Sequence, residues 1–281
     1  VIAGGKRSSR RRRLNLLAAA LLAAGGLVGA SMLSVRHDPL TWFPPQTEIR
    51  QTYAEMDAQV GGTANVLLLI EALPGKTIKD RELLLRLERF EKRIEPYRLP
   101  GMQEPMVDNT TSVLDVVRES WRALNGGGDA FYELPDSQRG VVDMFTLFES
   151  ASPDELKRLV TIDMARALMN IRVKWMDAWS YRPLTEAIQS EVEKGVGDRA
   201  KAKLTGTVFA FFSVVAALLV DLFRSFSTAF VAITIMMIVL LREPKLGFIS
   251  MLPNLLPIVV VMGMMGFADI RIDVSNMLIA S

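Results

Sequence analysis

Apolar residues concentrate in two parts of the chain and leave a long charged stretch between them. Residues 14–35 form an uncharged run of about 22 residues, which is close to the roughly 20 that a membrane-spanning helix needs. The chain turns apolar again from Thr207 to Ser281. Residues 36–206 have the mixed charge of an ordinary soluble domain. This pattern predicts an α-helical membrane protein with one large extramembrane insert.

The uncharged runs predict three complete spans and the start of a fourth. We expect transmembrane helices at residues 14–35, 225–241 and 246–267, and the beginning of another at residues 274–281. Residues 207–224 include the charged pair Asp221 and Arg224, so we expect an interfacial helix there. Because a basic segment precedes the first run, a cleaved secretory or twin-arginine signal is an alternative to an anchor.

The basic residues next to these runs predict one orientation. Arg10–Arg13 precede the first run, and Arg242 and Lys245 lie between the runs at 225–241 and 246–267. Cytoplasmic loops carry an excess of Lys and Arg. Residues 1–13 are therefore expected in the cytoplasm and residues 36–206 outside it. The short loop Asp269–Asp273 is expected outside as well.

The pattern of residues 36–206 predicts a series of strands and helices. We expect strands where apolar residues run together or alternate, and helices where they recur at helical spacing. In order, these are strand Asn65–Ala72, helix Ile78–Tyr97, a weak strand near Met102–Val107, helices Asn109–Leu124 and Val141–Glu149, strand Met169–Lys174, helix Leu184–Val192 and strand Arg199–Leu204. This order predicts an α+β, ferredoxin-like domain that carries a helical insertion.

Composition excludes several classes of site. Lys and Arg (33) nearly balance Asp and Glu (31), so the net charge of +2 provides no field for nucleic acid. The run Arg10–Arg13 could serve as a nucleic-acid arm, but its place beside an apolar run favours a membrane flank. The sequence contains no Cys and one His, His37, so we expect no metal site.

Catalytic motifs are also missing from the sequence. Pro74–Thr77 ends like a phosphate-binding loop, but position 70 is Ile where that motif requires Gly, so we interpret it as a turn. There is no nucleophile elbow and no His-based triad. Glu88 and Glu91 are interpreted as ordinary surface charges of one helix. We therefore expect no enzyme, no catalytic residue, no cofactor and no nucleotide.

The run at 246–267 contains the unusual segment PNLLP. Pro253 and Pro257 each lack a backbone N–H, and Asn254 brings an amide into an apolar helix. We interpret these three residues as a transport-related motif that bends the helix and packs it, with Gly263 and Gly266 allowing close contact with another helix.

Several segments together resemble one family. These are DPLTWFP at Asp38–Pro44, GGTANVLLLIEA at Gly61–Ala72, the segment Ser152–Val173, Thr205-Gly206 followed by the RSF of Arg224–Phe226, and PNLLPI at Pro253–Ile258. In this order they resemble the RND superfamily, specifically its MMPL-like or hydrophobe/amphiphile exporter branch. That branch is related to hopanoid exporters and to Patched-type sterol-sensing proteins.

The resemblance implies a function and a missing part. Such proteins have two six-span repeats, a porter domain after the first span of each, and proton-relay residues in the fourth span. They export lipids or other amphiphiles with the proton gradient, here across a bacterial cytoplasmic membrane. The chain is expected to be an N-terminal fragment, not competent alone, whose relay residues lie beyond Ser281. Its partners would be an amphiphilic substrate, membrane lipids, and the rest of its chain or an oligomer partner.

Two other functions remain open at this point. A non-transporting, sterol-sensing-like lipid sensor or an envelope scaffold would also combine apolar helices with an outer domain. An Asp in the middle of the fourth span would favour a pump over these alternatives. A regulator of envelope polysaccharide chain length has two spans around an outer domain, and the third predicted span argues against it.

Overall fold

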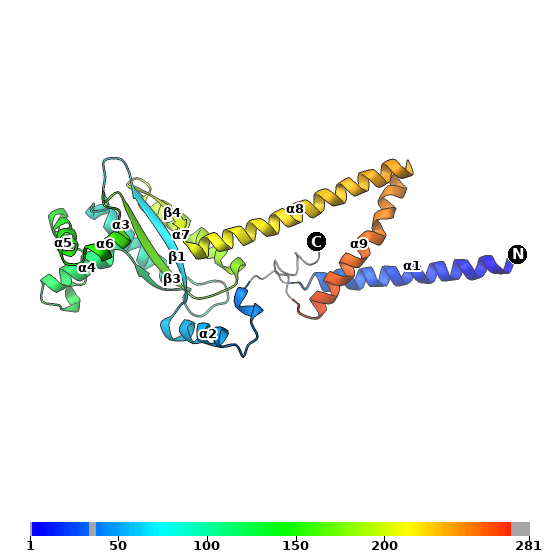
Figure 1. The fold of residues 1–281 in the computed structure, drawn as a ribbon, viewed down its shortest axis with the longest axis horizontal. Helices are drawn as coiled ribbons and strands as arrows, with labels where there is room; N and C mark the ends of the chain where they lie inside the picture. The colour runs from blue at the N-terminus through cyan, green and yellow to red at the C-terminus, as the bar shows by residue number, and fades with distance from the viewer. Residues whose placement is uncertain (1, 34–37, 271–281) are drawn as a thin grey trace. The chain divides into compact units, whose positions relative to one another are not determined.

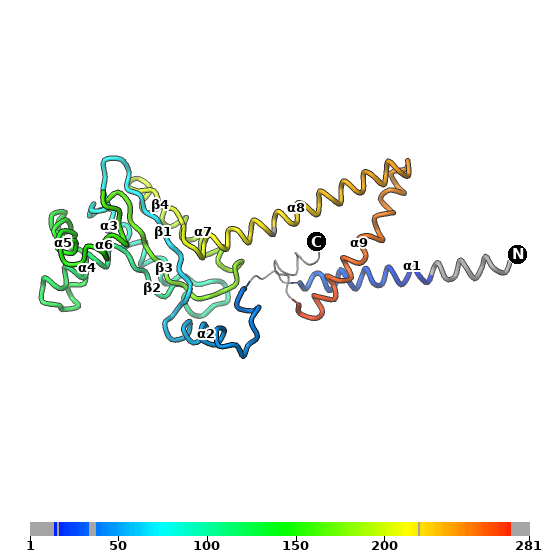
Figure 2. Tube along the Cα trace, viewed as in Figure 1, coloured from blue at the N-terminus to red at the C-terminus, as the bar shows by residue number. Residues whose placement is uncertain are grey.

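The computed structural model describes residues 2–33 and 38–270, and the chain divides into two compact units. Residues 38–214 form one unit, and residues 1–37 together with 215–281 form the other. The first apolar segment and the last two apolar helices thus belong to the same unit, although a whole domain separates them along the chain. Figures 1 and 2 show the elements of each unit.

A four-stranded antiparallel sheet forms the centre of residues 38–214. Its order is β2-β3-β1-β4, so the first strand pairs with both the third and the fourth. The helices α3 and α7 follow β1 and β3, which gives the β-α-β-β-α-β order of a split βαβ unit (Figure 1). The bounds are β1 Ala64–Ala72, α3 Arg81–Ile94, β2 Val107–Thr111, β3 Arg166–Val173, α7 Tyr181–Val196 and β4 Ala200–Thr205.

One face of the sheet is buried and the other is partly open. In β1, Val66, Leu68 and Ile70 are buried, the residues between them are partly exposed, and the flanking Asn65 and Glu71 are exposed. Because side chains alternate along a strand, this pattern places one continuous apolar face toward the core. The helices supply the other side of that core with Leu83, Leu84, Leu87 and Phe90 of α3 and with Leu184, Ile188 and Val192 of α7.

Three helices are inserted between β2 and β3. They are α4 Val113–Leu124, α5 Gln138–Ala151 and α6 Pro153–Leu159. A capping box starts α4, because the Ser112 hydroxyl accepts from the Leu114 N–H while the Asp115 carboxylate accepts from the Ser112 N–H. Before the sheet, a short 3₁₀ turn at Pro39–Trp42 leads into helix α2, Glu48–Val60. The weak strand expected near Met102–Val107 lies slightly later, at Val107–Thr111.

Three long helices make up most of the helical unit, which consists of residues 1–37 and 215–281. They are α1 Ile2–Ala30, whose second half is apolar, α8 Thr207–Leu241, whose first residues belong to the sheet domain, and α9 Pro244–Phe267. The helix α8 is continuous over 35 residues and includes both the expected interfacial segment at 207–224 and the expected span at 225–241. At the turn between α8 and α9, Arg242 adopts a left-handed conformation with φ of 55°.

The predicted fold class is wrong in its membrane part. By length and composition, two helices of the described chain could cross a membrane, α8 and α9; three complete spans and a fourth are not shown. The apolar part of α1, Leu17–Ala30, is shorter than a span because the helix ends at Ala30, before the uncharged run at 14–35 is complete. The fourth span, expected at 274–281, lies outside the described residues.

Candidate functional site

The predicted motif of Pro253, Asn254 and Pro257 lies within α9. Pro253, Asn254 and Pro257 are all exposed in this structure, and both prolines are inside the continuous helix. A proline provides no N–H to the carbonyl four residues earlier, so the carbonyls of Ile249 and Pro253 lose the donor that an α-helix normally supplies. The Asn254 amide nitrogen lies 3.9 Å from the sulfur of Met251, which is a weak acceptor. The motif therefore presents polar backbone and side-chain groups on one side of an apolar helix.

The opposite side of α9 packs against α1. Gly26 and Gly29 of α1 face Gly263 and Gly266 of α9, and these glycines are buried. A Cβ atom added at Gly26 would lie 2.7 Å from the carbonyl oxygen of Val259, and one added at Gly29, Gly263 or Gly266 would overlap the facing backbone. Glycine is required here because the two backbones touch. The close contact expected at Gly263 and Gly266 is confirmed, with α1 as the partner.

The order of these contacts shows that α1 and α9 run in the same direction. Gly26 faces Val259 and Gly263, and the later Gly29 faces Gly263 and the later Gly266. At about 3.6 residues per turn, the glycines and the motif lie roughly half a turn apart around α9. The motif is therefore free to meet another partner while α1 occupies the glycine face.

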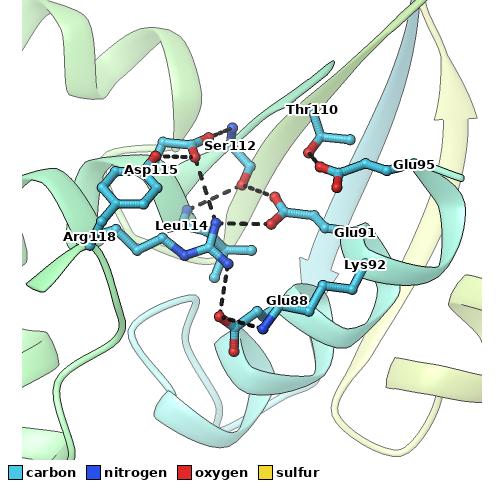
Figure 3. Close-up of polar contacts among 10 residues, drawn as sticks. Glu88, Glu91, Lys92, Glu95, Thr110, Ser112, Leu114, Asp115 and Arg118 are labelled. Carbon is cyan, nitrogen blue, oxygen red and sulfur yellow. Dashed lines mark hydrogen bonds and ion pairs between the residues drawn. The ribbon is translucent and has the colours of Figure 1, made fainter. Parts of the chain in front are cut away.

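The sheet domain, residues 38–214, contains a buried charge cluster between α3 and α4 (Figure 3). Arg118 of α4 donates to Glu91 at 3.0 Å and to Glu88 at 3.1 Å, both on α3. The Ser112 hydroxyl donates to the second oxygen of Glu91 at 3.2 Å. Asp115 lies 3.7 Å from the same guanidinium. Glu91 is 3% exposed and Arg118 is 8% exposed, so the central pair is shielded from water.

The interpretation of Glu91 as a surface charge is wrong. Leu84, Leu87, Glu91 and Ile94 follow one another at spacings of three, four and three residues, so Glu91 stands in the apolar stripe of α3. That spacing was a readable signal for burial. What the sequence of α3 could not supply is the partner, because Arg118 is on a different helix and is brought close by the fold.

Burial controls the charge of this cluster. It raises the pKa of Glu91 to about 7, and the negative charge of Asp115 adds to that effect, while the Arg118 guanidinium and the Ser112 hydroxyl act against it. One guanidinium faces three carboxylates, those of Glu88, Glu91 and Asp115. Lys92 reaches Glu88 from the surface at 3.4 Å. The cluster can therefore take up a proton near neutral pH without leaving its buried position.

The same domain has two further features that could serve as sites, an open depression and a turn. An open depression of about 410 Å³ lies between α3 and α7, and Arg93 and Glu191 form an ion pair of 3.4 Å at its edge. It is lined by Arg93, Ile94, Tyr97, Ala187, Ser190 and Glu191. The segment Pro74–Thr77 forms a turn in which Gly75 has φ of 81°, as expected. Within residues 2–33 and 38–270, no group of three or more His, Cys, Asp or Glu side chains could hold a metal ion.

Comparisons with known proteins do not add a family. No protein-family model matches this chain, and no curated protein matches it either.

Proposed function

We propose that this chain belongs to a membrane transporter of the RND superfamily, in its MMPL-like branch, and that it exports lipids or other amphiphiles. In this proposal the chain resides in the cytoplasmic membrane of a bacterium, with residues 38–206 on the outer side. The proton gradient drives export. The observation that supports it best is the layout of the units: a split βαβ domain is inserted between two chain segments that return to form one helical unit.

The packing within the helical unit gives further support. Close contact through Gly26, Gly29, Gly263 and Gly266 is the packing that apolar helices use in lipid, where burial of apolar area does not hold helices together. The charge pattern agrees with the proposed orientation. Arg242 and Lys245 lie at the turn between α8 and α9, and an excess of basic residues favours the cytoplasmic side for that turn.

In this proposal the motif Pro253, Asn254 and Pro257 provides the contact for the part of the transporter that moves protons. Helices with broken backbone hydrogen bonds are tolerated in membranes where neighbouring helices satisfy the freed groups. The exposed face of α9 opposite α1 is available for that neighbour. The motif acts through shape and packing and does not itself carry protons.

The proposal is tested by lipid analysis of cells. Deleting the gene should remove one lipid class from the outer envelope and cause it to accumulate in the cytoplasmic membrane. Wild type should restore the distribution, and a variant with Pro253→Ala and Pro257→Ala should restore it incompletely while reaching the membrane at wild-type levels. Ser250→Ala, one turn earlier on α9, serves as the control.

The same experiment separates a transporter from a lipid sensor. A sensor would change the expression or activity of other proteins, and the cell's total lipid synthesis with them, without leaving an unexported lipid behind. An unchanged envelope composition after deletion would contradict the proposal.

A further inference from the structure

Helix α2 carries an apolar stripe that is left open in this structure. Ile49, Met56 and Val60 are 44%, 47% and 46% exposed, and α2 has no buried residue. At about 3.6 residues per turn, these three side chains lie close together along one side of the helix. In a globular domain, the apolar stripe of a helix normally faces the core. The stripe of α2 is exposed instead, so it is available for a partner outside the domain.

The stripe is held in a fixed position by Trp175, which follows β3. The Asp57 carboxylate of α2 accepts the Trp175 backbone N–H at 2.9 Å, and the Tyr53 ring packs edge-on against the Trp175 ring at 5.6 Å. The Asp38 carboxylate accepts the Trp175 indole N–H at 3.0 Å. Both ends of the segment 38–60 are thus attached to the same residue. The helix is tied to the sheet domain by one side, and its apolar stripe lies beside that attachment.

The segment before α2 lies close in sequence to the apolar part of α1. Trp42 follows Ala30, the last residue of α1, by 12 positions. Trp42 and Phe43 are 53% and 41% exposed, and Arg50 of α2 donates to the Phe43 carbonyl at 3.0 Å. Trp is enriched at the interface between membrane and water, where its amphipathic ring lies at the level of the lipid head groups.

The charges of α2 indicate which kind of lipid surface fits. The helix carries three acidic residues, Glu48, Glu55 and Asp57, and one basic residue, Arg50. Helices that bind anionic lipids carry Lys and Arg on their polar face, and α2 does not. Its attraction to a membrane would therefore come from apolar contact, which a neutral lipid surface provides without repulsion.

We propose that the apolar stripe of α2 docks into the interface of the bilayer, among neutral zwitterionic lipids, and holds the sheet domain at the membrane surface. This inference rests on the proposed membrane location. It assigns to Ile49, Met56 and Val60 a binding surface for lipid that is separate from the motif on α9. The docked helix would fix where the domain meets lipid that leaves or enters the bilayer.

The test uses the absence of cysteine from the chain. Single cysteines replace Ile49, Met56 or Val60 in the stripe, and matched controls replace Gln51 or Ala54, which are exposed on the other side of the same helix. Each variant of the whole chain carries a nitroxide label and is placed in phosphatidylcholine nanodiscs. Electron paramagnetic resonance then compares the accessibility of each label to oxygen, which concentrates in lipid, and to a water-soluble nickel chelate.

We expect the ratio of oxygen to nickel accessibility to be several-fold higher at the stripe than at Gln51 and Ala54. Replacing half of the phosphatidylcholine by phosphatidylglycerol should not raise it. Equal ratios at all five positions, or a rise with the anionic lipid, would contradict the inference. Protection of the stripe from both reagents would also contradict it, because it would mean that protein, such as a second copy, covers the stripe.

A nitroxide label at Met236 on α8, a residue that is 67% exposed, tests the proposed membrane location independently of α2. If Met236 is in lipid and the stripe is in water, the membrane location stands and the docking of α2 is wrong. If Met236 is in water as well, the proposed membrane function itself fails.

Discussion

Two helix–helix contacts in this protein follow different physical rules. In the helical unit, α1 and α9 meet through four glycines, with backbone against backbone. In the sheet domain, α3 and α4 meet around a buried Glu91–Arg118 pair that is surrounded by an apolar core. The first contact excludes side chains, and the second depends on them. The glycine contact depends on how closely the two backbones fit, whereas the α3–α4 contact depends on burial of the pair together with the apolar residues around it.

The largest expected effect is on the buried ion pair. Replacing Arg118 with Met leaves Glu91 buried without its cation and should lower the unfolding free energy of the sheet domain by about 3–5 kcal/mol at pH 7.5. Urea unfolding of the whole chain in detergent, followed by tryptophan fluorescence, measures this loss.

Arg122→Met is the matched control for that prediction. Arg122 lies one turn further along α4 and pairs with Glu119 at the surface. Because exposed ion pairs contribute little, its loss should cost less than about 1 kcal/mol. Similar losses for the two variants would show that Arg118 is not the cation on which the buried carboxylate depends.

A smaller effect is expected at the glycine contact. Gly266→Ala places a methyl group against the backbone at Gly29, and overpacking of this kind costs about 1–3 kcal/mol. The change should move α1 away from α9. Nitroxide labels at the exposed residues Leu27 and Met264 report the separation by pulsed electron paramagnetic resonance.

Gly25→Ala provides the control on α1, since an added Cβ there meets nothing within 4 Å. It should leave the label distance unchanged. If Gly266→Ala also leaves it unchanged, close backbone fit is not what holds α1 to α9.

A third effect is a pH dependence of the sheet domain. The pKa of Glu91 is raised from 4.5 to about 7 in the folded state. At pH values between about 4.5 and 7, the carboxyl group is ionised in the unfolded chain but still protonated in the folded one. The free energy of unfolding therefore falls as the pH rises through this range. We expect the melting temperature of wild type to fall between pH 5 and pH 8 by a few degrees more than that of Glu91→Gln.

Glu119→Gln, which removes an exposed carboxylate from α4, should keep the wild-type dependence. An identical pH profile for wild type and Glu91→Gln would contradict the assignment of the buried proton to Glu91.

The two contacts also show how far the sequence could predict this protein. Local sequence patterns predict structure well where residues close together in the chain determine it. Examples are the alternation of β1, the apolar stripe of α3 and the glycines of α9. Such patterns are insufficient where the outcome depends on distant parts. The helix α1 ends at Ala30 although the uncharged run continues, so counting uncharged residues overestimated the span.

The same limit applies to the candidate sites. The sequence identifies Pro253, Asn254 and Pro257 as an unusual motif. The segment alone does not predict which helix packs against them. The spacing of α3 indicates that Glu91 is buried, but its partner, Arg118, lies on α4 beyond β2 and could not be identified from α3. The exposed stripe of α2 has the same spacing as a core stripe, and only the fold shows that it remains uncovered by the sheet domain.

The central claim, proton-driven export of an amphiphile, is tested most directly in inverted membrane vesicles from cells that make the protein. In such vesicles export from the cell becomes uptake into the lumen. The account predicts that a labelled lipid of the class identified by the deletion accumulates when a proton gradient is imposed, and that an uncoupler abolishes this accumulation. Equal accumulation with and without the gradient, or with and without the protein, would contradict it.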